Sequence, residues 1–218
     1  ICIYKIMNIA INGFGRIGRL LTRSLQKEQN LNLVHVNSGA SVDTACHLLK
    51  YDSVHGKFSG NVNCIPNNET DPYSYFKFDD KLVKYTQERD ITNLNWDNVD
   101  LVVDCTGKYT NKDSASKHIT AGANKVLISA PGVNVDYTAV YGVNHTDLKN
   151  DHSIISSGSC TTNCLAPIAE ILDENLGIEK GFITTIHSYT GDQNLVDNSH
   201  KDLYRSRAAS CSIVPTKT

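Results

Sequence analysis

The stretch "SGSCTTNCLAP", residues 157–167, places two cysteines four positions apart among small hydroxylated residues, where an apolar run begins. Such a pair can ligate a metal, form a disulfide or supply a reactive thiol. A metal needs more ligands than this pair, and no neighbouring His or Cys completes a familiar spacing. Cys160 falls at the predicted start of a helix, where unpaired N–H groups and the helix dipole lower the pKa of a thiol. One turn further along, we expect Cys164 to be small and buried.

A candidate base follows later in the chain. His187 stands 27 residues after Cys160, at the end of "GFITTIHSYTG" (181–191), which we interpret as a strand running into a loop. A strand end beside a helix start can bring the two side chains together, and the imidazole can then hold the thiolate as an ion pair and exchange protons with a substrate. From the spacing alone, a structural histidine is an equal alternative.

A glycine motif near the start of the chain predicts a second kind of chemistry. "GFGRIG" (13–18) follows a short apolar strand and opens a run with apolar residues at helical spacing. In that context the glycines let the backbone approach a pyrophosphate, and the helix N-terminus offers unpaired N–H groups. The predicted dinucleotide site is formed by Gly13, Phe14, Gly15, Arg16, Ile17 and Gly18.

The residues after the second predicted strand (31–37) bear on which dinucleotide is bound. An NAD site of this type usually has an acidic residue about twenty positions after the glycines, which binds the adenosine ribose. Here the chain has Asn37, Ser38 and Gly39. Without a carboxylate, a 2′-phosphate meets no repulsion, so NADP is admissible beside NAD. The alternative is that Asn37 and Ser38 only cap the next turn.

The elements that must position these residues follow an alternating order. A helical run at 42–52 follows the second strand, and apolar runs at 99–107 and 125–131 indicate buried parallel strands, with a helix beginning near Asn111 between them. The section 57–98 is expected to be irregular, with short strands and a hairpin turn at the "DD" of "YFKFDDKLVKY". A further helix fits Thr162 to Asn175.

These patterns predict an α/β fold. A Rossmann-type doubly wound parallel sheet is expected in residues 7–158, followed by the first part of an α+β catalytic domain in residues 159–218. Met7 is the only methionine and precedes the first strand, so we expect residues 1–6 to lie upstream of the natural start.

Composition narrows the class of protein. With 218 residues, 40% of them hydrophobic, and a net charge of −2, the chain is typical of a globular protein without a general field for nucleic acid or membrane lipid. No run of eighteen apolar residues and no signal peptide are present, so a cytoplasmic location is expected. The seven cysteines form no C-x-x-C pair, which argues against a disulfide scaffold and a zinc ribbon. We expect most of them to be reduced.

Four segments in this order, "INGFGRIGR", "KYDSVHGKF", "SCTTNCLAP" and "HSYTGDQ", resemble the phosphorylating glyceraldehyde-3-phosphate dehydrogenase family, and the match runs from Met7 to Thr218. The resemblance implies oxidation of D-glyceraldehyde 3-phosphate to 1,3-bisphosphoglycerate through a cysteine thioester, with hydride transfer to NAD or NADP. It also implies a cytoplasmic homotetramer of glycolysis and gluconeogenesis. Substrate and inorganic phosphate are the partners, and no nucleic acid, membrane or metal is expected.

The resemblance also assigns roles to residues. Cys160 matches the family's nucleophile and His187 matches its base. Further cofactor contacts are implied at Arg89, Thr106, Gly107 and Ser129, and substrate or phosphate contacts at Ser159, Thr161, Thr190, Asp192 and Thr218.

Two departures from the family pattern matter. Ser38 replaces the usual Asp after the second strand, and Ser199 in "DNSHKDL" stands where NAD-specific members usually have proline, which implies acceptance of NADP. The chain stops after "PTKT", where whole members continue. It therefore resembles an N-terminal fragment, with the activity belonging to the complete protein.

Three other functions compete with this interpretation. Erythrose-4-phosphate dehydrogenase shares "SCTTNC" and similar chemistry, although "CLAP" and "HSYTGDQ" favour the glyceraldehyde enzyme. The fragment could instead be a dinucleotide-binding module without catalysis. A Cys/His hydrolase would use the same pair of residues but leaves the glycine turn unexplained.

Overall fold

The computed structural model describes residues 6–216, so the predicted phosphate contact Thr218 lies outside the described residues. The chain divides into two compact units, the first ending at Cys160 and the second beginning at Thr161. No helix in the described part of the chain is long and apolar enough to cross a membrane.

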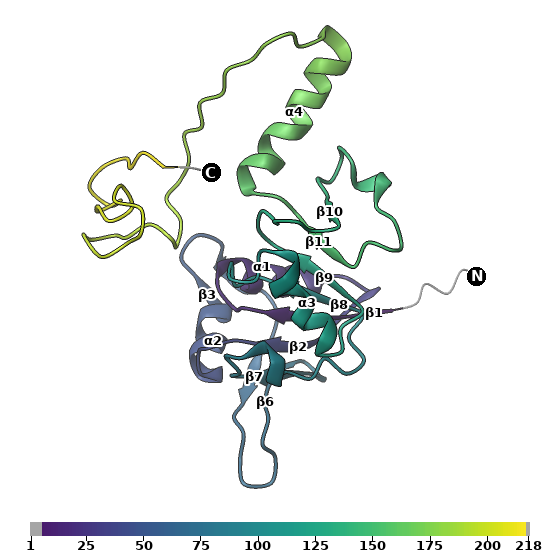
Figure 1. The fold of residues 1–218 in the computed structure, drawn as a ribbon. Coiled ribbons are helices and arrows are strands. Elements are labelled where there is room, and N and C mark those ends of the chain that lie inside the picture. The colour runs from purple at the N-terminus through teal and green to yellow at the C-terminus, as the bar shows by residue number, and fades with distance from the viewer. Residues whose placement is uncertain (1–5, 217–218) are drawn as a thin grey trace. The chain divides into compact units, whose positions relative to one another are not determined.

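The first unit is built on a nine-stranded sheet within residues 6–160 (Figure 1). Its central six strands run parallel in the order β7-β2-β1-β8-β9-β11. This is the 3-2-1-4-5-6 order of dinucleotide-binding folds, in which the direction of winding reverses between the first and fourth strands. The bounds are β1 Met7–Asn12, β2 Leu31–Asn37, β7 Lys81–Thr86, β8 Leu101–Asp104, β9 Lys125–Ile128 and β11 Ile154–Ser156, with β10 Tyr137–Thr138, β6 Ser74–Phe78 and β5 Asn63–Ile65 at the margins.

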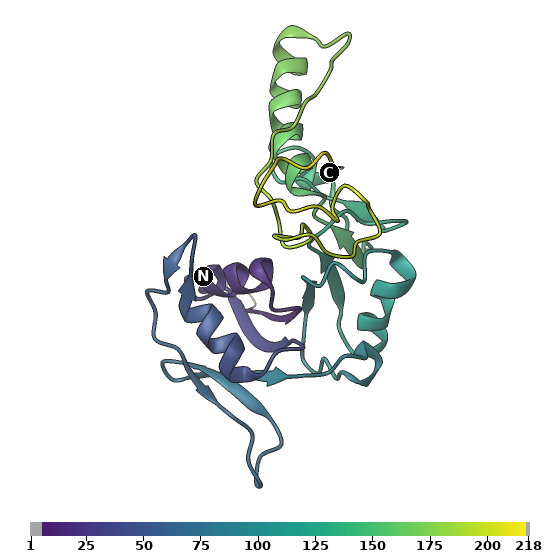
Figure 2. The same ribbon diagram turned by 90° about the vertical axis from the view of Figure 1, so that its left-hand side faces the viewer.

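Helices cover both faces of this sheet. Figure 2 shows α1 (Arg16–Leu25) and α2 (Val42–Lys50) on one side and α3 (Lys112–Thr120) on the other. Alternate residues of β1 serve the two faces, because Ile9 and Ile11 join the core under α1 and α2 whereas Ala10 joins the opposite core around Trp96. The predicted doubly wound α/β architecture is confirmed. Shorter elements are η1 Ile91–Asn93, η2 His145–Asp147, β3 Tyr51–Asp52 and β4 Gly56–Lys57.

The helix starts follow from local side-chain chemistry. The Ser41 hydroxyl accepts a hydrogen bond from Thr44 N at the start of α2, and the Asn111 side chain accepts one from Ser114 N at the start of α3. The predicted beginning of a helix near Asn111 is therefore confirmed. By contrast α1 begins at Gly15, which has no side chain to cap it.

The predicted hairpin is present, with its turn at the two aspartates. Strands β6 and β7 pair antiparallel, and Asp79 in the turn has a positive φ of 49°. The sequence did not predict where the hairpin packs. Strand β7 runs parallel to β2, so the hairpin extends the main sheet, and Phe76 and Tyr85 enter the same core as Ile11.

One disulfide, Cys46–Cys64, joins α2 to β5 and was not predicted, although the expectation that most cysteines are reduced agrees with the described residues. The two residues are 18 positions apart, and it is the packing of α2 against β5 that brings them together. Sequence spacing does not encode that contact. Among the described cysteines, Cys105, Cys160, Cys164 and Cys211 are not disulfide-bonded.

The second unit contains most of α4 (Cys160–Leu176), the green helix of Figure 1, which confirms the helix predicted from Thr162 to Asn175. Two other expectations were wrong. Cys164 is exposed, because no residue of α4 is buried. The predicted strand at 181–191 is absent, and residues 177–216 hold neither helix nor strand. A strand needs a neighbour to take up its backbone hydrogen bonds, and no described residue pairs with this segment.

Candidate cofactor and catalytic sites

The carboxyl ends of five parallel strands coincide at one edge of the first unit's sheet. In the register, Asn12 of β1 lies opposite Asn37 of β2 and Asp104 of β8, while Thr86 of β7 and Ile128 of β9 complete the row. All the predicted cofactor residues lie at the last residue of one of these strands or in the segment that directly follows it. Ligands of open α/β sheets bind at this edge, where the winding reverses.

The three glycines of the turn after β1 have different structural roles. Gly13 has a φ of 95°, and a Cβ there would lie 2.8 Å from the backbone of Cys105 and Thr106. A Cβ on Gly18 would lie 2.2 Å from the carbonyl oxygen of Gly13. A Cβ on Gly15, at the start of α1, would meet nothing within 4 Å. The first and third glycines therefore permit close packing, whereas the second leaves open space at a helix N-terminus, which suits a pyrophosphate.

The first turn of α1 favours an anion. It contains no acidic residue and no side-chain cap, so its N–H groups and the positive end of the helix dipole face the loop. Arg16 adds a positive charge and pairs with Asp52 at 3.3 Å. Backbone N–H groups of His55 and Val54, together with Arg16, lower the pKa of Asp52 to about 2. Phe14 is buried in the core and its carbonyl accepts from Arg19, while Ile17 is exposed beside the turn.

A buried hydrogen-bond network lies directly beneath this edge. Asn37 Nδ2 donates to Asn12 Oδ1, Asn12 Nδ2 donates to Asp104 Oδ2, and His118 Nε2 lies 3.1 Å from the same carboxylate oxygen. The indole N–H of Trp96 donates to His118 Nδ1, so the neutral imidazole carries its proton on Nε2 and donates it to Asp104. The network links β2, β1, β8 and α3, and sequence reasoning missed it. The sequence feature that could have predicted this network is a polar residue at the end of each apolar strand.

This network determines what Asn37 can do for a cofactor. Its Nδ2 donates to Asn12 and to the carbonyl of Glu88, and its Oδ1 accepts from the Thr86 hydroxyl and from Glu88 N. All four hydrogen-bonding positions of the amide are occupied, and the residue is buried. Ser38, the next residue, is half-buried, and its Oγ accepts from Ala40 N at 3.4 Å, which is the turn contact of the alternative interpretation; its contact with a ribose stays a prediction. Arg89 is exposed just beyond Glu88.

The loop after β8 is held by the other half of the Asp104 carboxylate. Its Oδ1 accepts from the backbone N and the hydroxyl of Thr106, and Gly107 follows with a φ of 68°. Burial raises the pKa of the neighbouring Cys105 thiol to about 11 despite a hydrogen bond with Ser129, which disfavours its thiolate form. The carboxyl edge of the sheet, where the cofactor is predicted to bind (the cofactor edge), therefore carries Thr106, Gly107 and Ser129.

Cys160 and the residues around it lie where the two units meet in the sequence. Ser159 follows the buried Gly158, and Cys160 is exposed at the first position of α4. Thr161 is the next residue of the helix and begins the second unit. A thiol at a helix N-terminus is stabilised as the thiolate by the helix dipole. The predicted helix-start position of Cys160 is confirmed.

His187 belongs to the second unit, so its predicted pairing with Cys160 stays a prediction. Its Nδ1 lies 2.6 Å from the carbonyl oxygen of Ser188. A carbonyl only accepts, so Nδ1 carries the proton and the lone pair of the neutral ring is on Nε2. The side chain is exposed and has the tautomer that a general base at Nε2 requires.

An arginine that sequence reasoning missed stands among the predicted phosphate contacts. Arg205 forms an ion pair with Asp192, and its Nε donates to Thr216 at 2.6 Å. Burial raises the pKa of Asp192, but hydrogen bonds from Arg205 and His200 outweigh it, so the pKa is lowered. Because Asp192 is anionic, it suits holding the guanidinium better than contacting phosphate itself. Thr190 lies two residues away, in a turn closed by Gln193.

Strand order, glycine turn and uncapped helix define the first unit as a Rossmann-type dinucleotide-binding domain. The sequence matches two protein-family models. The family model for the NAD-binding domain of glyceraldehyde 3-phosphate dehydrogenase matches residues 7–112, and the family model for the C-terminal domain of the same enzymes matches residues 159–218. The chain belongs to the glyceraldehyde-3-phosphate dehydrogenase family.

Individual relatives agree with this assignment. The glyceraldehyde-3-phosphate dehydrogenase of Xanthobacter flavus is 46% identical over 216 residues, covering 97% of this chain and 62% of the relative. That of Pseudomonas aeruginosa is 48% identical, covering 97% and 63%. The chloroplastic glyceraldehyde-3-phosphate dehydrogenase A of Chlamydomonas reinhardtii is 48% identical, covering 98% and 57%. The chain thus spans about three fifths of the length of these relatives.

Proposed function

We propose that the full-length protein oxidises D-glyceraldehyde 3-phosphate to 1,3-bisphosphoglycerate, as a cytoplasmic homotetramer acting in glycolysis and gluconeogenesis. The observation that carries the proposal is the position of Cys160, an exposed thiol at the first residue of α4 in a chain that also has a dinucleotide-binding edge. Among the seven cysteines, Cys105 illustrates the alternative environment, where burial suppresses the thiolate.

The cysteine begins the reaction. The Cys160 thiolate adds to the aldehyde carbon, and the imidazolium of His187 gives its proton to the resulting oxyanion, which forms a hemithioacetal. His187 Nε2 removes the proton from its hydroxyl as the hydride leaves carbon, which yields a thioester. An oxygen of inorganic phosphate then attacks the thioester carbon, releasing the acyl phosphate and restoring the thiolate. Ser159 and Thr161 flank Cys160 and offer hydroxyls to the inorganic phosphate.

The substrate's own phosphate needs a cation. Thr190 offers a hydroxyl, and Arg205, held in place by Asp192, brings a positive charge to the same segment. The nicotinamide dinucleotide supplies the hydride acceptor. Gly15 and the N-terminus of α1 would hold its pyrophosphate, Ser38 and Arg89 would contact its adenosine end, and Thr106, Gly107 and Ser129 would supply further contacts.

The finer proposal is that NADP is accepted at least comparably to NAD. The hydrogen-bonding positions of the Asn37 amide are all occupied by Asn12, Thr86 and Glu88. We therefore expect the neutral hydroxyl of Ser38 to be the group that faces a 2′-phosphate. Ser199 of the "DNSH" loop supports the same proposal independently, because it stands where NAD-specific members of the family usually have proline.

Turnover by two cysteine variants of the full-length protein tests the activity. Cys160→Ser should reduce phosphate-dependent oxidation of the aldehyde by at least about 10³-fold, because an alkoxide is far less accessible than a thiolate. Cys164→Ser, one turn away, is the matched control and should retain most activity. Equal losses in both variants would refute the assignment, and cofactor binding without turnover in the parent would identify a binding module. Faster turnover of erythrose 4-phosphate would favour the related dehydrogenase.

The cofactor proposal has its own test. Ser38→Asp should shift the ratio of kcat/KM values toward NAD by roughly tenfold to several hundredfold, because a carboxylate would face the 2′-phosphate in a partly exposed site. Asn37→Asp is less informative, since it would break the buried network. A parent that strongly prefers NAD, with an unchanged preference in Ser38→Asp, would show that position 38 does not read the ribose.

A further inference from the structure

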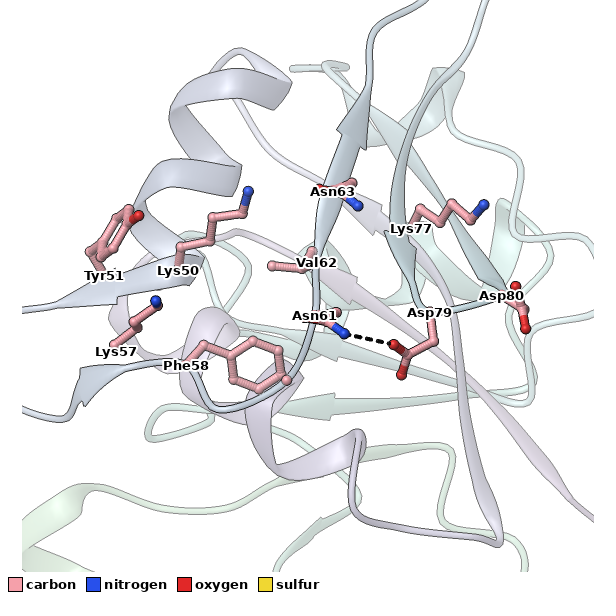
Figure 3. Close-up of a pocket in the computed structure, with 11 residues that line it drawn as sticks. Lys50, Tyr51, Lys57, Phe58, Asn61, Val62, Asn63, Lys77, Asp79 and Asp80 are labelled. Atoms are coloured by element: carbon pink, nitrogen blue, oxygen red, sulfur yellow. Dashed lines mark hydrogen bonds between the residues drawn. The ribbon is translucent and has the colours of Figure 1, made fainter.

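A pocket of about 610 Å³ lies in the first unit and shares no lining residue with the predicted cofactor or substrate contacts. It is formed by the end of α2, by β4, by the segment that leads into β5, and by the β6–β7 turn (Figure 3). Its volume is within the range of pockets that hold small ligands, roughly 300 to 1,000 Å³.

Three lysines from three different elements line this pocket. Lys50 ends α2, Lys57 lies on β4, and Lys77 lies on β6 opposite Asn63 of β5. Figure 3 shows Lys50 and Lys57 on one side of the segment through Asn61 and Asn63, and Lys77 on the other. Within residues 6–216, no carboxylate lies within ion-pair distance of these ammonium groups, although Arg16 and Lys112 of the same unit have acidic partners.

Two aspartates of the hairpin turn also border the pocket, and they do not neutralise the lysines at contact distance. Asp79 instead accepts a hydrogen bond from Asn61 Nδ2 at 3.3 Å, which fixes the turn to the segment before β5. Asp80 is exposed beside it. Lys77 lies on the same side of the Asn61–Asn63 segment as these two aspartates, whereas Lys50 and Lys57 lie on the other side, away from the carboxylates (Figure 3).

The walls that carry the lysines are held in place. The disulfide of Cys46 and Cys64 ties α2, four residues before Lys50, to β5, next to Asn63. Phe58 is buried between the Phe78 ring, at 6.3 Å between centroids, and the Arg23 guanidinium, 5.6 Å from its ring centroid. Because these contacts fix the backbone on both sides of the pocket, the lysine backbones need little ordering on binding.

We infer that this pocket binds a small anion carrying two or more phosphate groups. Lysine is a point-charge phosphate ligand, and the three lysines that line this pocket bring positive charges whose mutual repulsion an anion would relieve. A single charge does not reach lysines on both sides of β5, whereas a linear polyphosphate or a bisphosphorylated sugar does. The site is separate from the proposed active site, so each proposal can fail without the other.

The test is calorimetric titration of the full-length protein with tripolyphosphate, with a bisphosphorylated sugar and inorganic phosphate as parallel probes. In the variant Lys50→Gln/Lys57→Gln/Lys77→Gln, affinity for tripolyphosphate should fall roughly tenfold for each lysine removed. The control Lys27→Gln/Lys117→Gln/Lys149→Gln removes the same charge from exposed positions of the same unit and should lower affinity less than threefold or so. Unchanged NAD binding shows that both variants are folded.

A further variant tests whether removing a negative charge from the pocket raises the affinity for tripolyphosphate. Asp80→Asn keeps a residue that suits a turn and removes a negative charge from the rim, so tripolyphosphate should bind about threefold more tightly. Tighter binding of tripolyphosphate than of the sugar would identify a linear polyphosphate as the ligand, and the reverse order a sugar bisphosphate. Equal losses in the two lysine variants, retention of binding by the pocket variant, or no binding by the parent would each overturn the inference.

Discussion

The two units of the chain differ in how their apolar residues are covered. In the first unit, three clusters of buried side chains fill both faces of the sheet, and Phe76, Trp96 and Ile11 have no exposed surface. In the second, no residue of α4 is buried, and Phe182 and Ile186 are 95% and 90% exposed.

This difference explains which elements formed as predicted. Each apolar run of the first unit has its neighbouring strands within the same unit, so local pattern and pairing agree. The run 181–191 has comparable β-forming residues, but among the described residues no strand pairs with it. Strand propensity reflects packing against neighbours more than a preference of the backbone itself. Without them, the propensity produced no strand.

The largest expected effect contrasts two phenylalanines. In urea unfolding of the 218-residue chain, Phe76→Ala should lower the free energy of unfolding by about 3–5 kcal/mol, because it removes a fully buried ring. Phe182→Ala should change it by less than about 0.5 kcal/mol, since that ring is exposed. Similar losses in the two variants would show that the second unit has a core of its own, and the contrast between the units would fail.

Much of the fold was predictable from the sequence. The strand at 31–37 was predicted with its observed bounds, and the starts at Met7 and Asn111 and the turn at Asp79 followed from local patterns. Features that depend on contacts between distant segments were missed. They include the parallel pairing of β7 with β2 and the disulfide between Cys46 and Cys64. In physical terms, periodicity encodes which face is buried, and it does not encode what that face meets.

Prediction of the candidate site from the sequence had the same limit. The glycine turn and Cys160 carry their chemistry in local sequence, so both could be recognised. The saturation of Asn37 could not, because its partners Asn12, Thr86 and Glu88 come from three separate segments. Arg205 was missed for a similar reason, since a single arginine in a polar loop has no distinctive pattern until Asp192 is placed beside it.

A smaller effect is expected from the network beneath the cofactor edge. Asp104 accepts four hydrogen bonds, from Thr106 N and Oγ1, Asn12 and His118. Asp104→Asn turns one accepting oxygen into a donor that faces other donors, so stability should fall by about 2–4 kcal/mol. Asp151→Asn, at an exposed turn, should change it by less than about 0.5 kcal/mol. Urea unfolding measures both, and a neutral Asp104→Asn would show that the network does not brace the first unit.

The smallest effect concerns pH and a buried histidine of the first unit. Burial, together with the charge of Lys84, lowers the pKa of His35 to about 3. Its Nε2 lies 3.0 Å from Thr86 Oγ1, whose hydroxyl donates to Asn37, so the neutral ring donates to Thr86. The unfolded chain takes up a proton at this side chain below about pH 6.5, whereas the folded chain does not until about pH 3. Neutral His35 therefore stabilises the fold fully above pH 6.5 and progressively less as pH falls toward 3.

The slope for one such proton is about 1.4 kcal/mol per pH unit at most, so about 1–2 kcal/mol should be lost between pH 6.5 and 5. Comparing urea unfolding of the parent and His35→Gln at these two pH values isolates the contribution, because glutamine keeps a donor near Thr86 and does not titrate. The variant should lose correspondingly less stability over this range, although it is less stable than the parent at pH 7. If His35→Gln and the parent lost the same stability between pH 6.5 and 5, His35 would already take up a proton in the folded chain at these pH values. The core around Trp96, which packs against His35, would then be less tightly closed than its buried surface indicates.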